Sequence, residues 1–173
     1  MKLCLLAVAL ALFCAVHGFS DNPEDQKKAE GMWKALGISS NDPKLQKHME
    51  KMTVVDVKVS FGNGDAVIET RIPLPDGTCK PMKIVFKKGD DGKYYHKCRF
   101  GEKTVDVVET DGENYAIVDI TIVRDGQAYQ TSTLYVRDTE SVAVSLVEQF
   151  KQRSEEKGYS PDQTKILPKG TAC

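Results

Sequence analysis

The sequence predicts an all-β protein, an eight-stranded antiparallel up-and-down β-barrel with one C-terminal α-helix packed on its wall. Three observations support this prediction. Short segments of alternating apolar and polar residues run from residue 53 to residue 137, turn residues separate them, and one segment of helical spacing follows. Because the connections are short, neighbouring strands are expected to be antiparallel.

Residues 1–18 are predicted to be a secretory signal peptide. One early cation, Lys2, precedes the apolar run from Leu3 to Val16, and small residues surround a cleavage point after Gly18. A cut after Ser20 fits nearly as well. The apolar run is too short to span a bilayer, so membrane insertion is not expected. Residues 19–173 should then form a single secreted, extracellular domain.

The charge balance and the histidine content exclude several classes of function. The chain of 173 residues carries 24 Lys and Arg against 25 Asp and Glu, a formal net charge of −1, which gives no electrostatic reason to expect nucleic acid as a partner. After cleavage only His48 and His96 remain, without metal-ligand spacing, and no Gly-x-Ser-x-Gly motif occurs. We therefore expect no enzyme activity, catalytic residue, metal or cofactor.

The first strand is expected around Trp33, the only tryptophan, in the segment Ala29 to Gly37. An indole can close one end of a barrel because it removes a large apolar surface from water, and Gly31 lets the backbone pack closely beside it.

Seven further strands are expected, and they are separated by turn residues. They span residues 53–61, 66–72, 79–86, 93–99, 103–109, 115–123 and 128–137. Gly62-Asn63-Gly64 makes a tight hairpin turn, and residues 89–92, 110–114 and 124–127 make the later ones. In each strand, every second side chain is expected to face the interior.

After Arg137 the spacing becomes helical. Val144, Val147, Phe150 and Lys151 fall near one face, with Ser141 as the N-cap and Gly158 past the end. Ser160-Pro161-Asp162-Gln163 is a second capping-box start, which predicts a single helical turn before Leu167-Pro168.

The order of these motifs resembles that of the lipocalin family. Four short motifs support the resemblance, and they occur in the family's order with eight strands and one helix between them. The motifs are Gly31-x-Trp33, Thr110-Asp111-x-x-x-Tyr115, Leu134-Tyr135-x-Arg137, and Leu167-Pro168-Lys169 before a terminal cysteine. Gly112 stands where the family often has tyrosine. Cys79 after Pro-x-Gly, the Asp90-Asp91-Gly92 turn into Tyr94-Tyr95, and Tyr115-Ala116 make the chain most similar to the avian extracellular fatty-acid-binding lipocalins.

The resemblance implies a carrier whose barrel holds a fatty acid or a similar apolar molecule. An eight-stranded barrel can hold one small ligand if its own side chains do not fill it. The predicted apolar contacts are Val55, Val57, Val59, Phe61, Ile68, Ile72, Met82, Ile84, Phe86, Val105, Val107, Val118 and Ile120. Lys103 is the candidate partner for a ligand carboxylate, and Tyr129 and Tyr135 are candidate hydroxyl donors.

The resemblance also implies a structural pair at the closed end. Arg137 is expected to lay its guanidinium over Trp33, beside Gly31, in a cation–π contact that contributes about 1 kcal/mol. We expect a monomer or weak dimer, and the sequence does not identify a cell-surface receptor.

Two alternatives to the fatty-acid carrier remain open, an odorant or pheromone carrier and a siderophore-binding antibacterial lipocalin. Some lipocalins of this group bind siderophores through cations inside the cup, and Lys103 matches one such lysine. Ile122 and Thr133 stand where the avian relative has arginines, so siderophore binding is the weaker alternative.

Three cysteines remain after cleavage, and the sequence leaves their pairing open. The barrel favours a disulfide between Cys79 and Cys173, which would hold the C-terminal tail on the wall. A bridge between Cys79 and Cys98 across the turn at residues 89–92 is the competing arrangement. In the favoured arrangement Cys98 carries a free thiol.

Overall fold

The computed structural model describes residues 23–73, 77–99 and 101–170. The predicted signal peptide and Cys173 lie outside these residues. Within them, no helix is both long and apolar enough to cross a membrane.

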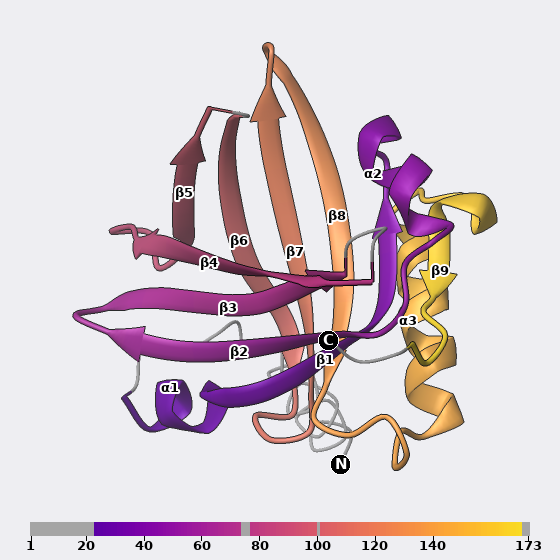
Figure 1. Cartoon of the computed structure of the whole chain (residues 1–173), viewed down its shortest axis with the longest axis horizontal. Helices are drawn as coiled ribbons and strands as arrows, with labels where there is room; N and C mark the ends of the chain where they lie inside the picture. The colour runs from indigo at the N-terminus through magenta and orange to yellow at the C-terminus, as the bar shows by residue number, and fades with distance from the viewer. Residues whose placement is uncertain (1–22, 74–76, 100, 171–173) are drawn as a thin grey trace, which may run out of the picture.

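Eight consecutive strands form a closed antiparallel barrel, which confirms the predicted fold class (Figure 1). They are β1 (Gly31–Ser40), β2 (Val55–Gly62), β3 (Asp65–Pro73), β4 (Cys79–Lys88), β5 (Tyr94–Cys98), β6 (Gly101–Thr110), β7 (Tyr115–Arg124) and β8 (Gln127–Val136). Each strand pairs with the next, and β1 pairs with both β8 and β2, so the sheet closes on itself.

The ladder between β4 and β5 is much shorter than the others. It has two residue pairs, Lys87 with Tyr95 and Lys88 with Tyr94, whereas β3 and β4 pair along eight. Figure 1 shows β4 turning away from β5 beyond these pairs. Over most of its length, the β5-facing edge of β4 therefore pairs with no strand of the described residues.

Helix α3 (Val144–Glu156) packs on the outside of the barrel. Phe150 is fully buried in a cluster with Leu36, Ile117 and Leu134. Gly37 makes room for this ring, because a Cβ atom there would lie 2.8 Å from Phe150 Cε1. Phe150 therefore fixes the helix to β1, β7 and β8, and Leu146 and Val147 pack against the same cluster.

Two details of the predicted helix were wrong. The N-cap is Ala143, not Ser141, because the helix begins later than the capping signal suggested. Val144 is 78% exposed, since it lies six residues before Phe150 and about a third of a turn away from the buried face.

Three elements were not predicted: α1 (Pro23–Ala29), α2 (Pro43–Met49) and β9 (Thr164–Ile166). The single turn predicted after Ser160 is present as η1 (Pro161–Gln163), with its capping box intact. β9 then pairs with β1 at Gly37 to Ser39, along the part of β1 that β2 leaves unpaired.

Candidate functional site

The sixteen predicted ligand contacts all lie on one face of the sheet. The ladders align Val57 with Thr70, and Thr70 with Met82, and such directly opposite residues share a face. The same registers join Tyr94 to Val105 and Ile120, and Lys103 to Ile122 and Tyr129. This is the inner face, because α3 packs on the other one. Whether these side chains touch a ligand stays a prediction.

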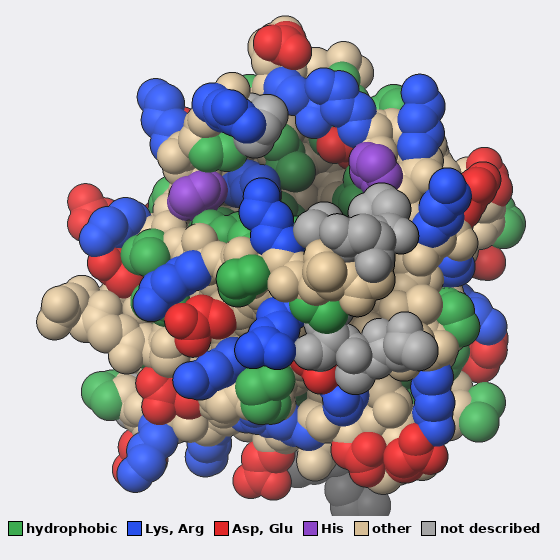
Figure 2. Space-filling model, in the orientation of Figure 1, with side chains coloured by type: hydrophobic (Ala, Val, Ile, Leu, Met, Phe, Trp, Pro, Cys, Tyr) green, Lys and Arg blue, Asp and Glu red, His purple; other side chains and the backbone are tan. Residues whose placement is uncertain are grey.

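The interior is hollow in its middle and filled at one end. Inner side chains such as Val59, Ile84, Val107 and Val118 are only partly buried, although a closed sheet surrounds them. A filled core would bury them as fully as the outer Ile117 and Leu134. Figure 2 shows a hollow with hydrophobic side chains inside it and Lys and Arg side chains around it.

Aromatic residues close the floor of this hollow. Phe86, Tyr94 and Ala66 are buried in one cluster, with Phe61 and Ile68 packed against it. These residues adjoin the turns between β2 and β3 and between β4 and β5. The barrel is therefore a cup that is closed at this end.

The strands separate charge between their two faces. Every acidic residue in the described strands alternates outward; these residues are Asp56, Asp65, Glu69, Glu102, Asp106, Glu109 and Asp119. Lys103 faces inward between Gly101 and Val105, is half-buried, and has neither an ion pair nor a hydrogen bond to a described residue. The cup thus offers a cation, without a carboxylate on the described strands to neutralise it.

The two tyrosines predicted as hydroxyl donors differ in environment. Tyr135 is half-buried on the inner face, and burial raises its pKa, partly opposed by a hydrogen bond with Thr133. Tyr129 lies near the open end, where its hydroxyl donates to Gln127 Oε1 at 2.9 Å. Tyr135 stays neutral at ordinary pH and is the better placed of the two to donate to a ligand.

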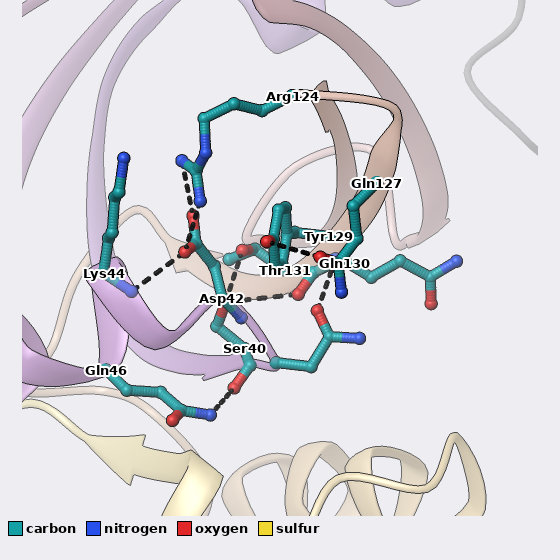
Figure 3. A network of polar contacts seen from close by, with 10 residues as sticks. Ser40, Asp42, Lys44, Gln46, Arg124, Gln127, Tyr129, Gln130 and Thr131 are labelled. Atoms are coloured by element: carbon teal, nitrogen blue, oxygen red, sulfur yellow. Dashed lines mark hydrogen bonds and ion pairs between the residues drawn. The ribbon is translucent and has the colours of Figure 1, made fainter. Parts of the chain in front are cut away.

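A buried ion pair ties α2 to the β7–β8 hairpin at the open end (Figure 3). Arg124 donates from Nη2 to Asp42 Oδ1 at 3.0 Å and from Nη1 to Oδ2 at 3.3 Å. Its guanidinium carbon lies 4.6 Å from the centroid of the Tyr129 ring. Asp42 also caps α2 by accepting from the Lys44 N–H at 2.9 Å.

This network lowers the pKa of Asp42. Burial alone would raise it, but the hydrogen bonds from Arg124 and from the Lys44 N–H outweigh burial. Ser40 extends the network, since its hydroxyl meets Thr131 Oγ1 at 2.8 Å and its carbonyl accepts from Gln46 Nε2 at 2.7 Å. One side of the open end is therefore held by charged and polar side chains.

At the closed end, Arg137 covers the indole of Trp33 as expected. The guanidinium carbon lies 3.7 Å from the ring centroid, and Nη1 donates to the Met32 carbonyl at 2.9 Å. Trp33 is 5% exposed and donates from Nε1 to the Ala29 carbonyl at 2.8 Å. Gly31 has φ of 101°, and a Cβ atom there would lie 3.3 Å from Arg137 Nη1. The pair joins α1 to the barrel.

The side chain of Asp111 holds the β6–β7 loop, in which Gly112 departs from the expected pattern. Asp111 Oδ1 accepts from the backbone N–H groups of Glu113, Asn114 and Tyr115. Burial alone would raise the pKa of Asp111, but these bonds hold it below its usual value. Gly112 has φ of 81°, which suits glycine.

The cysteines follow the predicted arrangement as far as the described residues reach. Cys79 takes part in a disulfide, and Cys98 is a free thiol. The competing bridge between Cys79 and Cys98 is therefore excluded. The partner of Cys79 lies outside the described residues, so the bridge to Cys173 stays a prediction.

Sequence reasoning missed three residues that shape the site: His96, Asp42 and Arg124. Asp42-Pro43 is an N-cap followed by proline at N1, a helix-start signal that could have found α2. His96 alternates with Tyr94 on β5 and faces inward, and its Nδ1 lies 3.0 Å from the Val85 carbonyl.

The comparisons with known proteins agree with this geometry. The model of the Lipocalin / cytosolic fatty-acid binding protein family matches residues 30–170. The extracellular fatty acid-binding protein of Gallus gallus is 31% identical over 176 residues, covering 100% of this chain and 97% of the relative. The protein of the same name from Coturnix japonica is 28% identical, with the same coverage.

Two solved structures share the fold. One, described as the siderocalin Ex-FABP with dual ligand specificities, has a TM-score of 0.71 and 29% identity, over 84% of this chain and 93% of that chain. The other, described as siderocalin Q83 with a dual ligand binding mode, has a TM-score of 0.73 and 25% identity, over 87% and 95%.

Proposed function

Because this chain belongs to the lipocalin family, we propose that it is a secreted, non-catalytic carrier that binds a fatty acid or a similar apolar molecule inside the barrel. The observation that carries the proposal is the inner face. It is apolar, partly exposed, closed at one end, and supplied with Lys103 but with no carboxylate on the described strands. The similarity to extracellular fatty acid-binding proteins of birds supports the same ligand class.

The energetics of this interior suit an acyl chain. Each buried methylene contributes about 0.8 kcal/mol, so ten methylenes contribute about 8 kcal/mol before the costs of association. A carboxylate near Lys103 adds an ion pair in a partly desolvated site. Together these terms are consistent with the micromolar or tighter affinity that we expect.

Displacement of a fluorescent fatty acid from the purified mature chain tests the proposal. Long-chain fatty acids should compete with micromolar or lower inhibition constants. Lys103→Met should weaken their binding severalfold, whereas Lys97→Met, on the outer face of β5, should not. If no fatty acid, retinoid or odorant shows saturable binding, the carrier function is refuted.

Siderophore binding is the second candidate, supported by the inward-facing Lys103 and by the two siderocalin structures that this chain resembles. A ferric tris-catecholate carries three negative charges. Two neighbouring positions that could carry further cations hold neutral side chains, because Ile122 lies directly opposite Lys103 on β7 and Thr133 is a buried hydroxyl. A ferric siderophore added to the same panel should therefore bind more weakly than a fatty acid.

Secretion follows from the predicted signal peptide and fits the disulfide at Cys79, since disulfides persist in oxidising compartments. Expression of the full chain in animal cells should deliver the protein to the medium. N-terminal sequencing should then place the cut after Gly18 or Ser20. Light scattering of the secreted protein would test the expected monomer or weak dimer.

A further inference from the structure

We infer that His96 and Lys103 together bind the anionic head group of the ligand, and that His96 strengthens this binding as the pH falls from about 7.5 to about 5.5. The inference rests on the proposed function. It adds a second head-group residue and a pH dependence to the same site.

The two side chains stand next to each other on the wall of the cup. His96 lies directly opposite Lys103 in the β5–β6 ladder, where Cβ atoms on one face are about 4.5–5.5 Å apart. Both are half-buried on the inner face. The imidazole centroid is 5.5 Å from that of Phe86, so the ring rests against the aromatic floor of the cup.

The hydrogen bond of His96 fixes which nitrogen can gain a proton. Nδ1 lies 3.0 Å from the Val85 carbonyl oxygen, and a carbonyl only accepts, so Nδ1 carries the proton of the neutral ring. Nε2 is then the nitrogen that becomes protonated. Because β5 does not pair with β4 at Val85, this bond also satisfies a carbonyl on an open strand edge. Protonation therefore adds a charge and a donor while the ring stays in place.

The other titratable groups near the inner face keep their charge over this pH range. They are Lys80 and Lys88 on β4, Tyr94 and Cys98 on β5, Lys103 on β6, Tyr129 and Tyr135 on β8, and the Asp42–Arg124 pair at the open end. Lysine and arginine remain cationic, and thiols and phenols ordinarily titrate above this range. The lowered pKa of Asp42 keeps it ionised. The described parts of β1, β2 and β3 bring no titratable side chain to this face. His96 is therefore the side chain on this face whose charge changes between these pH values.

An anion with two or three oxygens would gain most from this arrangement. Near pH 7.5 the anion meets the ammonium group of Lys103, and near pH 5.5 it meets the adjacent cations of Lys103 and His96 and a new N–H donor. A neutral head group gains no charge interaction. The site therefore selects for ligands that carry a carboxylate, sulfonate or similar group, and more strongly in acid.

The test uses the mature chain with N-phenyl-1-naphthylamine, a neutral fluorescent probe. A long-chain alkanesulfonate, which stays ionised throughout, and the alcohol of equal chain length compete for the cup. The inhibition constant of the sulfonate should fall about fivefold to tenfold from pH 7.5 to pH 5.5, the effect of one added charge several ångströms away. The inhibition constant of the alcohol should change less than about twofold, because a neutral head group gains no charge interaction with protonated His96.

Three variants locate the effect. His96→Asn keeps a donor near the position of Nδ1 but cannot become charged, and it should abolish the pH dependence. Lys103→Met should weaken sulfonate binding at both pH values and keep the dependence. His48→Asn, which changes an exposed histidine on α2, should behave as the wild type. An unchanged pH dependence in His96→Asn would overturn the inference.

A measurement on the unmutated protein guards against misfolding of the variants. If an anion binds beside protonated His96, saturation with the sulfonate must raise the midpoint of the His96 proton NMR titration by linkage. An unmoved midpoint refutes the inference. If the probe and every competitor fail to bind, the proposed carrier function is refuted. If sulfonate and alcohol bind equally at both pH values, the carrier stands and only the head-group site is refuted.

Discussion

Replacing Arg137 with methionine should destabilise the closed end through its contact with Trp33. The change keeps much of the aliphatic stem but removes the cation–π contact and the donors to the carbonyls of Met32, Lys28 and Glu113. Charge-assisted hydrogen bonds contribute about 1.5–3 kcal/mol each when buried. Because this guanidinium is only partly buried, we expect a total loss of about 3–4 kcal/mol, of which about 1–2 kcal/mol belongs to the indole contact.

A double-mutant cycle isolates that contact. Trp33→Leu alone should cost about 2–4 kcal/mol through lost packing, and the double variant should cost about 1–2 kcal/mol less than the sum of the single changes. Urea unfolding should be followed by circular dichroism, because Trp33 is the only tryptophan. Lys87→Met is the matched control, since its exposed pair with Asp65 lies on the outer face and should be additive with Trp33→Leu. Additivity of Arg137→Met and Trp33→Leu would show that the stacked contact contributes nothing.

Three further predictions concern packing, pH and the cysteines. Gly37→Ala should destabilise by about 1–3 kcal/mol because its Cβ would lie 2.8 Å from Phe150, and less in a Phe150→Leu background; equal losses in both would contradict the packing argument. The lowered pKa of Asp42 means that its carboxylate stabilises the fold above about pH 4 and stops doing so as the pH falls further. The stability deficit of Asp42→Asn should therefore shrink in acid, and a constant deficit from pH 7 to pH 3 would argue against it. Alkylation of the non-reduced protein should label Cys98 and spare Cys79 and Cys173; label on Cys173 would contradict the predicted bridge.

The alternation of side chains predicted the inner face well because its period follows from strand geometry alone. Val57, Val59 and Phe61 point inward whatever their neighbours are, provided that the strand forms. The Trp33–Arg137 contact followed from the family resemblance, and the structure contains it. These features depend on short-range pattern or on recognised motifs.

The missed features depend on tertiary structure or on very short segments. α1 and α2 have seven residues each, too few to show a helical period, and β9 has three and forms only by pairing with β1. The partnership of Asp42 with Arg124 joins residues 82 apart. The position of His96 beside Lys103 requires the β5–β6 register, which no local pattern fixes.

The two ends of the barrel are held by different kinds of contact, and this difference locates the adaptable part of the cup. At the closed end, Arg137 binds backbone carbonyls of α1, β1 and the β6–β7 loop, so the chain cannot open there without losing several bonds at once. At the open end, α2 is joined to the β7–β8 hairpin through the side chains of Asp42 and Arg124, and β4 separates from β5 after two residue pairs. Side-chain contacts can rearrange without unfolding a strand. A ligand should therefore enter and be accommodated at the α2 end, with His96 at the seam where β4 and β5 part, while the Trp33 end stays fixed.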